Sequence, residues 1–333
     1  MAILVTGVAG FIGFSTARAL LARGEVVVGI DNLSDYYDPR LKQARLDTLK
    51  AEHGGGFTFE PVDFAELDPL TALTTRYRFD RIVHLGAQAG VRYSLQHPHA
   101  YARSNMVGHL NMLELAREVQ PDHMVYASSS SVYGGNSQLP FRVEDRTERP
   151  LSLYAASKKA DELMSEAYAN LFRLPLTGLR FFTVYGPWGR PDMAMWLFTH
   201  ALFAGEPLRL FNGGAMRRDF TYVDDIVRGV IACLDRAPVD DGTEKAGGSV
   251  SPHALYNIGN HRSEELMRVV ELLERETGRN AVIELAPMQP GDVPDTFADI
   301  SAIERDHGFH PTTSIDDGIP RFVAWFRNYH GIE

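Results

Sequence analysis

Cysteine is nearly absent from this sequence, because Cys233 is the only one among 333 residues. A single cysteine excludes an intramolecular disulfide and any zinc site built from several cysteines, and it agrees with a reducing compartment. Long apolar runs are also missing. No stretch approaches the roughly 18 apolar residues of a membrane span, and no basic leader precedes the first apolar run at Ala2. We therefore expect a cytoplasmic protein that neither crosses a membrane nor is secreted.

Positive charge is scarce as well. The chain has 33 Lys and Arg against 43 Asp and Glu, which gives a formal net charge of −10. This balance argues against a nucleic-acid surface, so any anionic ligand must be held by local arginines and backbone N–H groups. Arg190, Arg217 and Arg218 are the candidates. The histidines show no His-Glu-x-x-His spacing and no clustered carboxylates, so no metal site is expected.

A glycine-rich turn opens the informative part of the sequence. An apolar run over residues 2–6 is typical of a buried strand, and Gly7, Gly10 and Gly13 follow it before a helical pattern over 14–23. Such glycines let the backbone approach a pyrophosphate, whose charge is stabilised by free N–H groups and by the positive end of the helix. The turn therefore predicts a dinucleotide site.

Asp31 adds to this prediction. It follows a second apolar strand, expected over 26–30, at the distance where an acidic residue meets an adenosine ribose. A carboxylate there repels a 2′-phosphate, and Val8 and Ala9 inside the turn offer no compensating charge. We expect NAD rather than NADP, and the alternative is that Asp31 is a solvated turn residue.

Tyr154 and Lys158 stand one helical turn apart on one face of an expected helix. A free phenol has a pKa of about 10, and a nearby ammonium lowers that pKa by favouring the phenolate. Tyr154 is then a base able to take an alcohol proton. The Tyr-x-x-x-Lys spacing also occurs by chance in exposed helices, but here Ser129 and a dinucleotide site accompany it, so we predict a catalytic role.

Strand-like runs alternate with helical patterns over the first half of the chain, and further strands are expected at 57–62, 81–85, 123–127 and 176–182. This alternation predicts an α/β fold with a doubly wound parallel sheet. We expect an NAD-binding domain over 1–182 and a smaller mixed α/β substrate lobe over 183–333, with elements near 220–260 interleaving with the first domain. The lobe is expected to hold isolated helices at 224–234, 263–277 and 320–329, and the polar 237–253 segment to be an exposed, mobile loop.

The motifs together resemble the extended short-chain dehydrogenase/reductase family, through TGVAGFIG at 6–13, HLGAQAG at 84–90, SSSSVYG at 128–134 and YAASK at 154–158. Within it the chain is similar to the UDP-glucuronate 4-epimerases, nearly from end to end. This closer likeness is carried by DNLSDYYDPRL at 31–41, QAGVRYS at 88–94, RFFTVYGPWGRPDMA at 180–194, RRDFTYVDDI at 217–226 and QPGDVPDTFADIS at 289–301.

The resemblance implies a Rossmann-like fold and roles for individual residues. It implies that Tyr154 is the base, that Ser129 acts at the same oxygen and that Lys158 holds the nicotinamide ribose. Residues expected to hold NAD are Gly7, Gly10, Phe11, Ile12, Gly13, Asp31, Asn32, Asp63, Phe64, Leu85, Ala87, Ala89, Asn105, Tyr154 and Lys158. Residues expected to hold the UDP-sugar are Arg92, Ser130, Ser131, Thr183, Arg190, Arg218 and Asp292. Gln289 departs from galactose-type epimerases, which have arginine there, and leaves more of the phosphate contact to Arg217 and Arg218.

The expected reaction is inversion at C4 of UDP-glucuronic acid, to UDP-galacturonic acid, through a 4-keto sugar. A UDP-glucuronate decarboxylase or a nucleotide-sugar dehydratase is the main alternative, but those enzymes carry carboxylates where this chain has Ser130 and Ser131. A non-catalytic NAD-binding scaffold is a further alternative, and the presence of Tyr154 and Lys158 argues against it. The family resemblance also implies a homodimer, formed through helices near 105–117 and 154–171.

Overall fold

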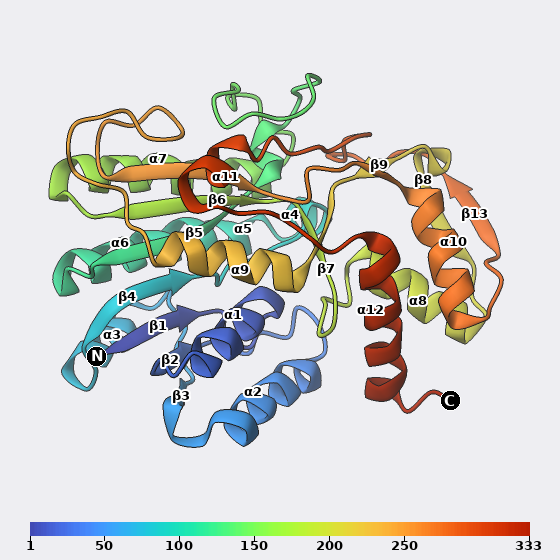
Figure 1. Cartoon of the computed structure of the whole chain (residues 1–333), viewed down its shortest axis with the longest axis horizontal. Helices are drawn as coiled ribbons and strands as arrows, with labels where there is room; N and C mark the ends of the chain where they lie inside the picture. Colours follow the sequence, from blue (N-terminus) through green and yellow to red (C-terminus); the bar gives the residue numbers. More distant parts are fainter.

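The computed structural model describes residues 1–333 and places a seven-stranded parallel sheet at the centre of the molecule (Figure 1). The strands follow the spatial order β11-β6-β5-β4-β1-β2-β3. Their bounds are β1 Ala2–Thr6, β2 Val27–Ile30, β3 Phe57–Glu60, β4 Phe79–His84, β5 His123–Ser129, β6 Leu176–Phe181 and β11 His253–Ile258. This order reverses between β1 and β4, and it confirms the predicted doubly wound parallel sheet.

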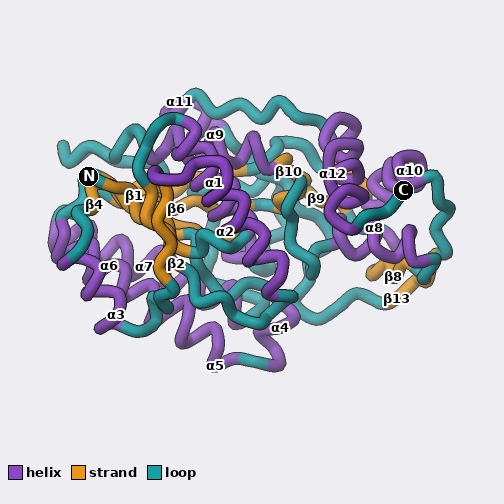
Figure 2. Tube along the Cα trace, turned by 90° about the horizontal axis from the view of Figure 1, so that it is seen from below, coloured by secondary structure: helices purple, strands orange, loops and turns teal.

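Helices cover both faces of this sheet (Figure 2). One face carries α1 (Phe11–Ala22), α2 (Pro39–His53), α9 (Val223–Leu234) and α11 (Ser301–His307). The other carries α3 (Leu67–Thr71), α6 (Gly108–Val119) and α7 (Leu153–Phe172). Between β4 and α6 the chain forms α4 (Val91–Gln96), α5 (Pro98–Tyr101) and a π-helical turn over Ala102–Val107.

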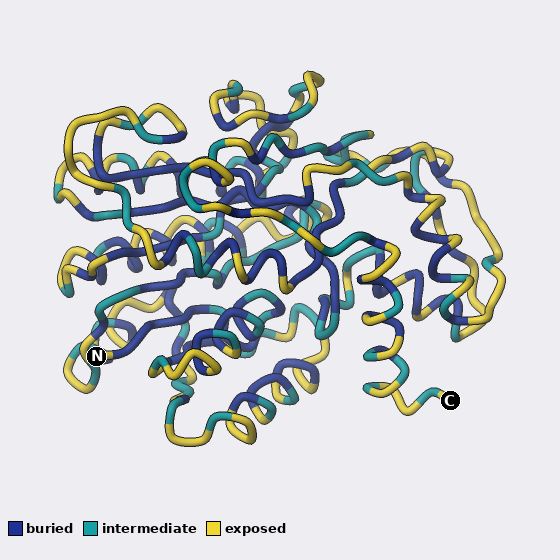
Figure 3. The backbone as a smooth tube through the Cα atoms, viewed as in Figure 1, coloured by how far each residue is buried: buried dark blue, intermediate teal, exposed yellow.

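Most of these strands are buried, because a parallel sheet is covered on both faces, whereas the edge strand β3 has only Phe57 buried. Side chains alternate along β1, so Ile3 and Val5 belong to a cluster of 36 buried residues on one face, and Leu4 belongs to a cluster of 21 on the other. Figure 3 shows most of the sheet in dark blue, with exposed positions concentrated in the loops and on the outer helices. The sheet is thus a rigid platform whose strand ends can position a site.

The second lobe has its own core, a cluster of 22 buried residues that includes one residue of α2, Leu41. Three helices contribute to it: α8 (Ala194–Ala204), α10 (Leu266–Thr277) and α12 (Ile315–His330). Three short strand pairs complete the lobe. They are β7 (Thr183–Tyr185) with β10 (Phe220–Tyr222), β9 (Arg217–Arg218) with β12 (Glu264–Glu265), and β8 (Leu208–Phe211) with β13 (Ile283–Ala286).

Three elements that follow residue 182 lie with the first domain rather than with the lobe. Strand β11 pairs with β6 at the edge of the central sheet, α9 packs against α1, and α11 packs against β11 and α9. The chain therefore crosses between the two parts more than once.

Two expected helices in the lobe have the wrong starts. The helix expected from 320 begins at Ile315, because Ser314 caps it through an Oγ that accepts from the Asp317 N–H at 3.2 Å, and Pro320 lies inside it. The helix expected from 263 begins at Leu266, because Glu264 and Glu265 pair antiparallel with Arg218 and Arg217 as a strand.

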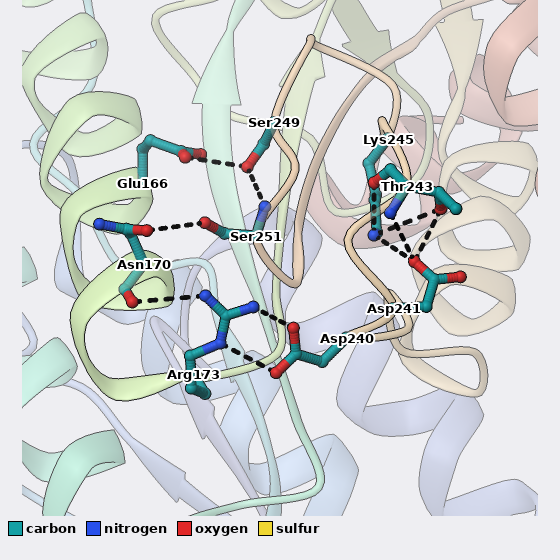
Figure 4. A network of polar contacts seen from close by, with 9 residues as sticks. All are labelled: Glu166, Asn170, Arg173, Asp240, Asp241, Thr243, Lys245, Ser249 and Ser251. Carbon is teal, nitrogen blue, oxygen red and sulfur yellow. Dashed lines mark hydrogen bonds and ion pairs between the residues drawn. The ribbon is translucent and has the colours of Figure 1, made fainter.

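The 237–253 segment has no helix or strand until His253, which begins β11 and was not expected to. The segment is tethered to α7 (Figure 4). Ser249 Oγ donates to Glu166 at 2.9 Å, and an ion pair joins Arg173 to Asp240. The main chain at Ala246 accepts from Leu255 of β11 at 2.9 Å. The segment is thus exposed over most of its length but is joined to α7 on one side and to β11 on the other.

Candidate active site

A cleft of about 1110 Å³ lies beyond the carboxyl ends of β1, β2, β4, β5 and β6, between the central sheet and the second lobe. Most of the residues that the sequence analysis expected to bind or react line this cleft. The three that do not are Asp63, Asn105 and Arg217. A single cleft therefore gathers motifs that are up to about three hundred residues apart in the chain, as the strand-end argument predicts.

The glycine turn forms one wall of the cleft. Gly7 has a φ of +67°, and a Cβ on Gly13 would stand only 2.1 Å from the Gly7 carbonyl oxygen. Neither position accepts a side chain. Helix α1 begins after Gly10 with no side chain capping its first N–H groups. Free N–H groups at the start of a twelve-residue helix, reached through a turn without side chains, fit a dinucleotide pyrophosphate.

Asp31 lies at the end of β2 and is tied to the glycine turn itself. Its Oδ2 accepts from the Ala9 N–H at 3.1 Å, and its Oδ1 accepts from the Leu33 N–H at 2.8 Å. Burial raises the pKa of this carboxyl, and the nearby Lys42 ammonium and the two backbone N–H groups oppose that rise. The carboxylate is therefore held in place where an adenosine ribose is expected.

Asp63 and Asn105 lie behind the cleft wall and hold other parts of it. Asp63 accepts from the Asn32 amide at 3.0 Å and from Arg103 at 2.9 Å. The Asn105 side chain accepts from the Gln88 N–H at 2.8 Å and donates to the Gln88 carbonyl at 3.0 Å. Direct contact of these two residues with NAD stays a prediction.

Ser129, Tyr154 and Lys158 all line the cleft. Ser129 ends β5, and its Oγ accepts from the Ser131 N–H at 3.1 Å. Tyr154 lies in the first turn of α7, which Ser152 caps through the Ala155 N–H at 3.1 Å. The Lys158 ammonium is 2 % exposed and donates to the Ala127 carbonyl at 2.9 Å. The three side chains are therefore set by the end of one strand and the start of one helix.

The sequence did not point to Asp161, which is the second partner of the lysine. Its Oδ2 accepts from Lys158 Nζ at 3.0 Å, and its Oδ1 has no partner. Burial raises the pKa of Asp161, and the Lys158 charge works against the rise. Lys158 therefore lines the cleft and also hydrogen-bonds to a buried carboxyl one turn further along α7.

Thr183 and Arg190 line the cleft on the side of the second lobe. The Arg190 guanidinium is already paired: Nε donates to Asp192 at 3.0 Å, and Nη2 donates to the other Asp192 oxygen at 2.5 Å. Tyr36, from the first domain, donates to Asp192 at 2.9 Å. Nη1 of Arg190 makes no hydrogen bond within the chain and is left for a ligand. Sequence reasoning singled out Arg190 but missed Asp192 and Tyr36, because each is a common polar residue until the fold brings them together.

The far end of the cleft holds Arg92, Arg218 and Asp292. Arg92 pairs with Asp292 at 3.1 Å and lies over the Phe211 ring at 4.3 Å from its centre. Arg218 donates to the Pro294 carbonyl at 2.8 Å, and burial lowers its pKa. Arg217, the other expected phosphate ligand, does not line the cleft and pairs with Glu265 at 2.8 Å. Alternate residues of the short strand β9 point to opposite sides, so only one of the two arginines reaches the cleft.

Comparisons with known proteins agree with this arrangement. The family model described as GDP-mannose 4,6 dehydratase matches residues 4–322. A probable UDP-glucuronate 4-epimerase from Rhizobium meliloti is 45% identical, with 99% of this chain and 98% of that protein covered. UDP-glucuronate 4-epimerase 4 of Arabidopsis thaliana is 44% identical, covering 98% of this chain and 76% of the plant protein.

One solved structure is informative about ligands. The UDP-glucuronic acid 4-epimerase of Bacillus cereus, in complex with UDP-glucuronic acid and NAD, superposes with a TM-score of 0.88. It is 32% identical in sequence and covers 99% of this chain and 100% of its own. No helix of the present chain is long and apolar enough to cross a membrane.

Proposed function

This chain belongs to the extended short-chain dehydrogenase/reductase family, and from that membership we infer that it is an NAD-dependent UDP-glucuronate 4-epimerase. The observation that carries the inference is that one cleft is lined both by Tyr154 and Lys158 and by Arg190. The first two residues suit oxidation at a sugar hydroxyl. The third suits a substrate with a carboxylate.

NAD is held at the glycine turn. The turn between β1 and α1 offers its N–H groups to the pyrophosphate, and Asp31 offers its carboxylate to the adenosine ribose. The apolar part of the cleft wall on the NAD side is formed by Phe11, Ile12, Phe64, Leu85, Ala87 and Ala89. Bound NAD supplies reversible acceptance of a hydride at C4 of the sugar. The chain supplies everything else that the reaction needs.

Proton transfer at O4 is the task of Tyr154. Its phenolic oxygen removes the O4 proton as the 4-keto sugar forms. The Ser129 hydroxyl donates to the same oxygen. The keto ring then turns over while Arg218 anchors the diphosphate and Asp292 the uridine ribose, so that the hydride would return to the opposite face of C4 and Tyr154 would return the proton to O4. C4 is thereby inverted.

The intermediate is chemically fragile. A ketone at C4 makes the C6 carboxylate part of a β-keto acid, which loses CO₂ when the C5–C6 bond lines up with the carbonyl π system. Arg190 and Thr183 are proposed to hold the carboxylate out of that geometry, with further donors from Ser130, Ser131 and Arg92. Asp192 and Tyr36 set the orientation of Arg190 in advance.

Product identity tests the proposed function against the decarboxylase alternative. Purified protein is incubated with UDP-glucuronic acid, the nucleotide sugars are separated, and CO₂ is assayed. We expect UDP-galacturonic acid with little CO₂, because the turn over 130–133 that faces the cleft presents hydroxyls and no carboxylate. UDP-xylose with stoichiometric CO₂ would instead identify a decarboxylase.

We also propose that the enzyme is a homodimer formed through α6 and α7. These helices pack side by side and expose apolar side chains that nothing in the chain covers. Leu163 and Leu171 on α7 are 60% and 67% exposed, and Met106, Val107 and Leu110 lie exposed along the adjoining helix. A patch of this kind is the usual mark of a protein interface.

A charged residue on this face is expected to prevent dimerisation. Leu163→Asp places a carboxylate in the centre of the patch, where a partner would desolvate it, so sedimentation should report monomers. Val282→Asp is the matched control, because Val282 is 61% exposed on the second lobe, away from α6 and α7. Wild-type protein that sediments as a monomer at micromolar concentration would rule the interface out.

Two broader proposals complete the description. We propose that the NAD-binding domain covers 1–182 and that the substrate lobe covers most of 183–333, which limited proteolysis can test. A cytoplasmic location is supported by the lone Cys233, which is buried and has no partner for a disulfide. Recovery of the protein in the cytosolic fraction of its cells tests this location.

A further inference from the structure

Arg45 is a charged residue that the reaction described above does not use. It lies on α2 in the first domain and is fully buried, with 0% of its surface exposed. No carboxylate pairs with it, and burial lowers its pKa. Burying an unpaired guanidinium costs free energy of folding. The hydrogen bonds of Arg45 must therefore fix contacts that an apolar side chain cannot make.

Its guanidinium joins the two halves of the cleft. Nη1 donates to the Ala9 carbonyl, in the glycine turn, at 2.7 Å. Nη2 donates to the Trp188 carbonyl at 2.6 Å and to the Gly189 carbonyl at 3.2 Å. Tyr37 OH also accepts from Nη1 at 2.6 Å. The planar guanidinium of Arg45 therefore links the glycine turn to the two residues that directly precede Arg190.

The turn that Arg45 holds is under backbone strain. Trp188 has a φ of +64°, in the left-handed region that bulky residues rarely adopt. Such a conformation persists only where the surroundings determine it. The Trp188 ring supplies part of that constraint, because it packs on Phe14 of α1 at 5.3 Å and on Trp325 of α12 at 5.4 Å between ring centres. The hydrogen bond from Arg45 supplies the other part, at the Trp188 carbonyl.

We propose that Arg45 is a positioning residue, which fixes the Trp188–Gly189 turn to the glycine turn so that Arg190 meets the substrate carboxylate in one orientation. The inference rests on the proposed function. The same segment of the first domain also reaches the Arg190 side chain, since Tyr36 donates to Asp192. Backbone and side chain of the carboxylate-binding turn are therefore both set from the NAD side of the cleft.

Losing this connection has a defined chemical consequence. When the carboxylate of the 4-keto sugar rotates, the C5–C6 bond breaks and C6 leaves as CO₂. The bonding electron pair moves to C5 and into the C4 carbonyl, and the resulting enolate takes a proton from water at C5. The product is a UDP-4-keto-pentose. The ratio of CO₂ to UDP-galacturonic acid therefore reports how well Arg190 is placed.

Arg45→Lys tests the proposal, because lysine keeps the charge but offers a single point of donation instead of a fork. Arg18→Lys is the matched control, since Arg18 is an exposed arginine on α1 paired with Glu52. The measurements are the ratio of CO₂ to epimer, the KM for UDP-glucuronic acid, the NAD content of the purified protein and the melting temperature. We expect Arg45→Lys to raise the ratio about tenfold or more, as for other small misplacements of a reacting group.

The outcomes separate the two levels of inference. A wild-type protein that makes no UDP-galacturonic acid would overturn the proposed function itself. A wild-type epimerase whose Arg45→Lys variant folds and leaks no more CO₂ than Arg18→Lys would overturn the positioning role alone. If Arg45→Lys does not fold, Arg45→Gln, which buries no charge, gives the same reading. Failure of both variants to fold would assign Arg45 to stability and also overturn the proposal.

Discussion

Tyr154→Phe is expected to lower kcat for epimerisation by about 10³-fold or more, the upper part of the range for loss of a general acid–base group. The substitution removes one oxygen. The ring remains in the first turn of α7 and keeps its edge contact with Tyr101, whose ring centre lies 6.0 Å away. NAD content and the affinity for UDP-glucuronic acid should therefore stay close to those of the wild type. Stopped-flow or discontinuous product assays measure the loss.

Tyr77→Phe is the matched control for this result. The substitution likewise removes a phenolic hydroxyl, which in Tyr77 donates to Glu60 at 2.7 Å. Tyr77 lies just before β4 and so at the end of the sheet opposite the cleft. The variant should turn over substrate like the wild type. If Tyr154→Phe kept even a tenth of the wild-type kcat, another group would have to be the base.

Arg190→Ala is the second large effect that we expect. Hydrogen bonds to charged groups contribute about 1.5–3 kcal/mol each, so loss of the carboxylate contact should lower kcat/KM by roughly 10²-fold or more. Because the carboxylate of the intermediate is then free to rotate, CO₂ release should rise relative to epimerisation. Separation of UDP-galacturonic acid from pentose products, with a CO₂ assay, measures both quantities.

Asp192 offers a second explanation for CO₂ release by Arg190→Ala, and a double variant separates the two explanations. Removing Arg190 takes away the charged partner of Asp192, and its carboxylate, held only by Tyr36, then faces the incoming substrate carboxylate. The double variant Arg190→Ala/Asp192→Ala removes both charges. If Arg190 acts by holding the substrate, the double variant still releases excess CO₂. Recovery of the wild-type product ratio in the double variant would mean that Asp192, not the loss of Arg190, caused the leak.

The sequence predicted those parts of the protein in which the signal is local. Gly7 and Gly13 lie in a turn that tolerates no Cβ, and Tyr154 and Lys158 lie one turn apart, so short spacing carries the information. Strand β11 was missed because it follows a polar, glycine-rich loop at a place where the chain had left the sheet. Only its pairing with β6 marks it as part of the central sheet.

Other residues of the site depend on contacts between distant segments. Arg45 bonds to carbonyls 36 and 143 residues away in the chain, and carbonyls carry no residue-type signal. Asp161 follows Lys158 on the same face of α7, but only burial distinguishes it from an exposed helical aspartate. Arg217 and Arg218 are adjacent and chemically equal, and only the pairing of β9 with β12 decides which one reaches the cleft.

Transient oxidation at C4 is the central claim, and the fate of the hydrogen on that carbon tests it most directly. UDP-glucuronic acid carrying deuterium at C4 is converted in ordinary water, and the product is examined by NMR and mass spectrometry. We predict UDP-galacturonic acid that retains deuterium at C4, because the hydride leaves and returns within one cleft without exchange. Epimer that carries protium at C4 would contradict the account, and so would deuterium at any other carbon.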